Sequence, residues 1–257
     1  VWDSVAIPQI GDVPRSQAIN LGYFDGMLAT MHRSPQSGVR SLFSSEQDIT
    51  QNRINPFDTD PGPRAASWVN LVADLTLILQ RVRPTEIVLP HPLLDTHPDH
   101  QFTAIATLEA LQSAGLTGGR LLFYTNHPVG TELHPFGARD GMVSIPPVHG
   151  NAPFFQSAVS LPLDRRTQLR KQVALQLQQD LRPEPASRPL RWRRIFLNSI
   201  RTPIRELTMP DDSYERRAVR PNELFLVVDF ASAAKVRDEY FAVPMASRAQ
   251  STGLSDR

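Results

Sequence analysis

The sequence predicts an α/β fold, in which a layered sheet of parallel strands is covered by helices, from three features. Hydrophobic residues recur at helical spacing in two segments, 66–83 and 101–114. Each segment is followed by a short apolar run typical of a buried strand, at 85–90 and 120–125. Regular alternation of helix and strand at these lengths is the pattern of parallel sheets.

Each element has its own local evidence. The first helix carries a regular apolar face and ends before Pro84, because proline cannot continue a helix. That face consists of Val69, Val72, Leu75, Leu79 and Val82. The second helix has Phe102, Ile105, Leu108 and Leu111 on one face and closes at Gly115 and Gly118. Residues 1–65 are rich in turn residues, and within them we expect a short strand at 18–21 that leads into a turn at Asp25 and Gly26.

The last third of the chain divides into three parts. A helix is predicted over 164–181 and a strand over 222–230, and between them lies a basic segment, 188–206, whose apolar residues share one helical face. We therefore expect a core domain over 1–181. Residues 182–257 would supply the basic amphipathic segment and a C-terminal strand and helix that pack on the core.

Composition limits the classes of function. The chain has a net charge of +1, which says little about partners, and it contains no run of eighteen apolar residues, so we expect a cytoplasmic protein. It has no cysteine, so any metal must be bound by His, Asp or Glu. An Arg-rich helix with a tryptophan, as in 188–206, can bind an anionic membrane surface, but we favour packing on the domain. Nucleic-acid binding is not indicated, because the aromatic residues do not alternate with basic residues along a strand.

The stretch 91–101, HPLLDTHPDHQ, holds three of the seven histidines of the chain. It follows the strand predicted at 85–90, and ligand sites of open α/β sheets form at the carboxyl ends of the strands. His97 and His100 are three residues apart at the start of a helix, so both can face one crevice. Asp99 is free to bond one imidazole and fix its tautomer. Capping by Asp95 or Thr96 would explain an acidic residue here but no pair of histidines.

Three quoted motifs resemble those of a known family. DTHPDH after an apolar strand, LGYFDG before it in the chain and LDRRTQLRKQVALQLQQ after it are similar, in this order, to motifs of the LmbE-like (PIG-L) zinc-dependent N-deacetylases. The resemblance covers residues 18–181, although the Ser-Gln ending of the family's later helix is not kept. It implies a Rossmann-like layered parallel sheet with helices on both faces. It also implies hydrolysis of an N-acetyl group on an amino sugar, such as N-acetylglucosamine, or on its glycoconjugates.

The resemblance also implies roles for individual residues. His100 would be a zinc ligand. His97 would line the acetyl site, where it stabilises the oxyanion or protonates the leaving amine, and Asp99 would tune it. Asp25 would accept hydrogen bonds from sugar hydroxyls. The cofactor would be zinc or another divalent ion, because His and carboxylate ligands accept several metals.

One part of the family pattern is absent. The family's first strand and its Ala-His-Pro-Asp-Asp-Glu motif, which supply two further ligands and the general base, do not occur in this sequence. The chain would then lack its N-terminal strand, or it would be a degenerate member without catalysis, a carbohydrate-binding or scaffold protein on the same fold. A third interpretation, which we rank lowest, is a metal site rebuilt from His91, Asp95 or His127. Loss of a central strand would expose apolar edges and favour self-association.

Overall fold

The computed structural model describes residues 2–59, 62–128, 135–138, 140–146, 153–178 and 217–243. The N-terminal part contains short helices only: α1 (Trp2–Ala6), η1 (Ile7–Gly11), η2 (Arg15–Gln17), α2 (Leu28–Arg33) and η3 (Thr50–Asn52). The central part contains α3 (Trp68–Val82), β1 (Glu86–Pro90), α4 (Pro98–Ser113) and β2 (Arg120–Tyr124). The last described part contains β3 (Ser157–Pro162), α5 (Arg165–Leu177), β4 (Asn222–Asp229), η6 (Phe230–Ser232) and α8 (Ala233–Ala242).

The protein is a mixed α/β structure around a four-stranded sheet in the order β1-β2-β4-β3. The parallel pairing expected for the first two strands is confirmed, with Glu86 opposite Arg120 and Pro90 opposite Tyr124. The sheet is not parallel throughout, because β4 pairs antiparallel with β2 and with β3. The predicted strand at 222–230 is therefore the inner strand β4, which explains its nearly continuous apolar sequence.

The two predicted helices begin and end at recognisable signals. The Ser67 hydroxyl accepts a hydrogen bond from the Asn70 amide at the start of α3, and Arg83 ends this helix in a left-handed conformation before Pro84. Pro98 occupies the first position of α4, where a missing amide hydrogen costs nothing. The helix therefore starts three residues earlier than the apolar periodicity predicts, and this places His100 in its first turn.

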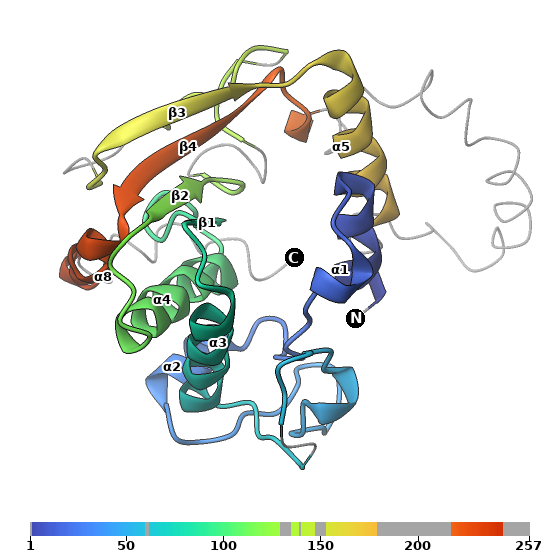
Figure 1. The fold of residues 1–257 in the computed structure, drawn as a ribbon, viewed down its shortest axis with the longest axis vertical. Helices are drawn as coiled ribbons and strands as arrows, with labels where there is room; N and C mark the ends of the chain where they lie inside the picture. The colour runs from blue at the N-terminus through green and yellow to red at the C-terminus, as the bar shows by residue number, and fades with distance from the viewer. Residues whose placement is uncertain are drawn as a thin grey trace, which may run out of the picture.

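The hydrophobic core is formed by the sheet together with residues of α2, α3, α4 and α8. Figure 1 shows α3 and α4 stacked beneath β1 and β2, with α8 at one end of the sheet and α5 beside α1 on the other side of the view. The core is built from α4 together with the inner strands, and its fully buried members include Ile105, Leu108, Leu111, Leu121, Phe123 and Val228. Burial of such side chains stabilises the fold by about 1.5–3 kcal/mol each.

The strand expected at 18–21 is wrong. The chain instead forms isolated bridges between separate loops, Asn20 with Ile54 and Asp48 with Ala65. The Asn20 side chain accepts a hydrogen bond from the amide of Gly22, which turns the chain immediately after the bridge. Gly22 itself has a φ of 80°, so an extended strand cannot continue through it.

Two further predictions have different outcomes. The helix predicted over 164–181 is found as α5, whose first turn is capped by the Asp164 carboxylate bonded to the Thr167 amide at 2.7 Å. The basic segment 188–206 lies outside the described residues, so its packing stays a prediction. Among the residues that the structure describes, no helix is both long and apolar enough to cross a membrane.

Candidate functional site

The loop between β1 and α4 is folded by a buried histidine. The Nδ1 atom of His91 accepts hydrogen bonds from the amides of Leu93 and Leu94, at 3.1 and 3.2 Å, which closes a tight turn. The His91 amide donates to the carbonyl of Tyr124 at 2.7 Å and so extends the parallel ladder by one residue. An acceptor Nδ1 places the proton on Nε2, and burial lowers the pKa of His91 to about 3, so the ring is neutral. His91 is thus a structural residue of the loop.

Asp95 connects this loop to the one that follows β2. Its side chain is inaccessible to solvent, and its Oδ2 atom accepts the amides of Asn126 and His127 at 2.9 and 3.2 Å. Its Oδ1 atom accepts the amide of His97 and lies 3.2 Å from Nδ1 of His100. Burial alone would raise the pKa of Asp95, but the contact with His100 and the amide bonds outweigh it and hold the pKa below its usual value. The buried carboxylate is therefore ionised at neutral pH.

Three imidazoles gather around Asp95 at the carboxyl ends of β1 and β2. The ring centroids of His97 and His127 are each 4.8 Å from that of His100, and they are 5.5 Å from each other. We call His97, His100 and His127 the histidine cluster. The Nδ1 atoms of His97 and His127 are buried with no hydrogen-bond partner among the described residues. Burial lowers the pKa of His127 to about 4, so it faces the cluster as a neutral ring. Nδ1 of His100 and Nε2 of His91 are likewise buried without a hydrogen-bond partner among the described residues, so a structural histidine shares this feature and it does not by itself indicate a ligand.

The DG motif of LGYFDG lies beside the histidine cluster because Asp99 binds it. One carboxylate oxygen of Asp99 accepts the Gly26 amide at 2.5 Å and the other accepts the Leu28 amide at 3.3 Å. Asp25 therefore lies next to Asp99 and His97, and both contribute to its electrostatic environment. Burial raises the pKa of Asp25 above its usual value, and the neighbouring Asp99 carboxylate raises it further.

Among the described residues Asp99 does not bond an imidazole, although the sequence suggests that it would. We expect it to bond one of the imidazoles, but its carboxylate accepts hydrogen bonds from the backbone amides of Gly26 and Leu28. The carboxylate at an imidazole is Asp95, which lies against His100. The reason is the helix start at Pro98, since Asp99 then belongs to the first turn of α4 and Asp95 to the loop beneath it. Asp99 fixes the position of the DG turn rather than an imidazole.

The histidine cluster offers one candidate metal ligand, His100, but does not form a complete metal site. Oδ1 of Asp95 lies 3.2 Å from Nδ1 of His100, although Nδ1 makes no hydrogen bond among the described residues, and 28% of the His100 side chain is exposed. A carboxylate bonded to this nitrogen would orient a metal-binding histidine. Within the described ranges, however, no three His, Asp or Glu side chains are arranged to hold a metal ion. A catalytic zinc ion needs three protein ligands. His100 is thus a candidate ligand, and the described residues do not complete a metal site around it.

Sequence reasoning undervalued two residues of this site. His127 follows β2 at the same edge of the sheet as His97, and that position was the available signal, because neighbouring parallel strands end together. The sequence suggests Asp95 as a helix cap, whereas its carboxylate joins the two loops.

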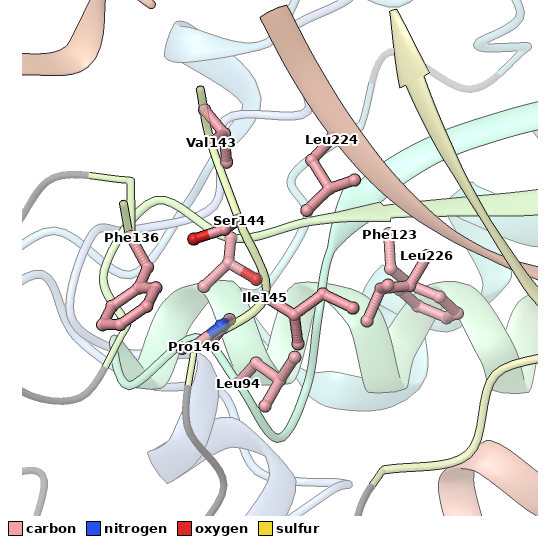
Figure 2. A pocket seen from close by; sticks show the side chains of 10 residues that line it. Leu94, Phe123, Phe136, Val143, Ser144, Ile145, Pro146, Leu224 and Leu226 are labelled. Carbon is pink, nitrogen blue, oxygen red and sulfur yellow. The ribbon is translucent and has the colours of Figure 1, made fainter. Parts of the chain in front are cut away.

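A separate apolar pocket lies nearby and is not part of the cluster. Figure 2 shows it between the segment 143–146 and the side chains of β2 and β4, with Ile145 extending toward Phe123 and Leu226. Leu94 lines it and directly precedes Asp95, but none of the three clustered histidines lines it. The pocket is lined mostly by apolar side chains, with Thr125 and Ser144 as its hydroxyl-bearing members.

Comparison of the chain with profiles of protein families, with curated proteins and with solved structures finds no match in any of the three. The resemblance to the LmbE-like deacetylases is thus carried by the motifs of this chain.

Proposed function

We propose that the protein is a metal-dependent hydrolase of the LmbE-like type, which removes an N-acetyl group from an amino sugar or its glycoconjugate. The observation that carries the proposal is the pair of bonds from the Gly26 and Leu28 amides to Asp99. These bonds bring LGYFDG and DTHPDH, which are about seventy residues apart in the chain, to one edge of the sheet. Two motifs chosen for their resemblance to one family therefore meet in space.

The proposed roles follow the contacts. His100 binds the metal through Nε2, with Asp95 holding its ring. His97 faces the acetyl group, and Asp25 accepts hydrogen bonds from sugar hydroxyls. When bound, a zinc ion would polarise the amide carbonyl and lower the pKa of its water to about 7. Two ligands besides His100 would be needed to complete a catalytic zinc site.

The proposal includes the finer fold. We propose that the mixed sheet belongs to a Rossmann-like layered architecture, with β1 and β2 as its parallel part. The β1–α4–β2 unit, with its loop site at the carboxyl ends of the strands, supports this.

The competing function is carbohydrate binding without catalysis on the same fold. It is favoured by one observation, the lack of a complete set of metal ligands among the described residues. Binding and hydrolysis separate in a single experiment, in which N-acetylglucosamine conjugates are incubated with the chain and zinc and the released acetate is measured.

The variants make that experiment specific. We expect zinc-dependent acetate release by the native chain and none by His100→Asn, while His32→Asn, a histidine outside the cluster, retains it. Binding of the conjugate without acetate release would instead support the carbohydrate-binding function. Equal acetate release by the native chain and His100→Asn would contradict the proposed site.

A further inference from the structure

A buried carboxylate on α3 has no place in the site described above. Asp74 lies on the core face of the helix with Trp68, Leu71 and Leu79, and only 1% of its surface is exposed. A carboxylate removed from water lowers stability unless donors replace the water. The donors that contact the Asp74 carboxylate therefore indicate its role.

Asp74 has three donors, and all come from other parts of the chain. Its Oδ2 atom accepts the Tyr23 hydroxyl at 2.8 Å and Nη1 of Arg53 at 2.6 Å. Its Oδ1 atom lies 3.0 Å from Nη2 of Arg64. Burial and then the Asp74 charge raise the pKa of Tyr23, so the hydroxyl stays protonated and donates. Both oxygens of Asp74 are thereby compensated.

Arg53 extends these contacts to the backbone of the DG loop. It pairs with Asp58 through two nitrogens, and its Nη1 atom also donates to the carbonyl of Leu21 at 3.2 Å. We call Tyr23, Arg53, Asp58, Arg64 and Asp74 the Asp74 cluster. Two guanidinium groups and two carboxylates balance its charge, as a buried ionic group requires.

The segment 21–28 is consequently held at both ends. The Leu21 carbonyl and the Tyr23 hydroxyl bind the Asp74 cluster, and the amides of its second half bind Asp99. Asp25 lies between these anchors. A loop with a few bonds at only one end would open far more easily than one held twice.

The contact between this segment and its support is close. A Cβ atom at Gly22 would lie 2.7 Å from the Ile49 carbonyl oxygen, so the backbone of the loop rests directly on the segment that carries Arg53. The loop position is thus set by the Asp74 cluster and by steric contact.

We propose that Asp74 is a positioning residue for Asp25: by holding Tyr23 and Arg53 it keeps the 21–28 segment where Asp25 lies beside Asp99 and His97. The consequence for sugar binding rests on the proposed function, but the positioning itself does not. The alternative is a cluster that only stabilises the fold as a whole.

Local hydrogen exchange separates these roles without any assay of activity. The readout is amide exchange, by mass spectrometry of peptides covering 21–28, compared with peptides of α4 and β2. Tyr23→Phe removes one bond to Asp74 at little cost in packing, and Asp74→Asn removes its charge. Val228→Ala, in β4, is the control, because it lowers global stability through the core and touches none of the loop anchors.

We expect Tyr23→Phe to accelerate amide exchange in peptides covering 21–28 about tenfold, which corresponds to one lost bond of a buried group. In peptides of α4 and β2, exchange should equal that of Val228→Ala when the two variants are compared at the same global stability. Asp74→Asn should have a larger effect in the same peptides. Exchange that rises equally in all peptides, or no faster in 21–28 than in Val228→Ala, would overturn the proposal. Where the hydrolase assay shows activity, Tyr23→Phe should raise KM more than it lowers kcat. Failure of that assay would count against the proposed function and leave the exchange result standing.

Discussion

The burial of His91 makes the stability of the protein sensitive to acid, in a way that one substitution can isolate. The pKa of His91 is about 3 in the folded protein, and an unfolded histidine has a pKa near 6.5. Above pH 6.5 neither state is protonated, so the residue contributes no pH dependence. Below it the unfolded chain binds a proton that the folded protein excludes, and stability falls as pH falls until about pH 3.

The size of this effect follows from the two pKa values. The full difference corresponds to about 5 kcal/mol, and about 2 kcal/mol of it is lost between pH 7.5 and pH 5. These magnitudes hold to within about one pKa unit, or roughly 1.4 kcal/mol. A protein domain has only about 5–15 kcal/mol of stability, so the loss is readily measured.

The substitution His91→Asn isolates the proton. Asparagine Oδ1 stands at the place of histidine Nδ1, so it can still accept the amides of Leu93 and Leu94, but it does not titrate. At pH 7.5 we expect His91→Asn to cost roughly 1–3 kcal/mol through lost ring packing against Phe123. His91→Leu should cost about 1–3 kcal/mol more than His91→Asn, because two buried amides lose their acceptor.

The assay is urea unfolding at pH 7.5, 6.0 and 5.0, followed by circular dichroism. The stability of the native chain should fall by about 2 kcal/mol more than that of His91→Asn between pH 7.5 and 5.0. Other titrating groups, His127 included, cancel in the difference. Parallel pH curves for the two proteins would refute the reasoning, since His91 would then titrate as an ordinary histidine.

The remaining predictions concern Asp95 and Gly22. Asp95→Asn places an NH₂ group opposite buried amide or imidazole donors, so the free energy of unfolding should fall by about 2–4 kcal/mol in urea unfolding at pH 7. A loss under about 1 kcal/mol would show that the carboxylate does not hold the two loops together. Gly22→Ala introduces a Cβ at a φ of 80° against the Ile49 carbonyl and should cost about 1–3 kcal/mol. Its control is Gly11→Ala, which meets no atom within 4 Å and should change stability by less than about 0.5 kcal/mol; equal effects of the two substitutions would contradict the close contact of the loop.

Elements with local signals could be predicted from the sequence. The helices α3 and α4 have an apolar repeat and a residue that starts or ends them, such as Ser67 or Pro98, and these signals act within a few residues. The strands β1 and β2 follow each helix directly, so even their parallel pairing is a local consequence of the order of elements.

The rest of the sheet depends on contacts that the local sequence does not contain. The strand β3, Ser157–Pro162, was not predicted, because all its residues are exposed and no alternation of burial marks it. Among the described residues it pairs with β4, about sixty residues later in the chain. The antiparallel pairing of β4 likewise depends on contacts between segments that are distant in the chain.

The candidate site divides in the same way. The pair His97 and His100 could be found from spacing on one helix turn. His127 joins them from another strand, and the different neighbours of Asp95 and Asp99 follow from the residue at which α4 begins. Pro98 is a local signal for that start, but which carboxylate meets the imidazole depends on how the 91–97 loop folds.

The most direct test of the account is the zinc content of the purified chain, measured by elemental analysis after loosely bound ions are removed. The account predicts close to one zinc per folded chain, lost in His100→Asn and retained in His32→Asn. A chain that binds no zinc under these conditions, or one that keeps its zinc without His100, would contradict the central claim that His100 and Asp95 form part of a metal site.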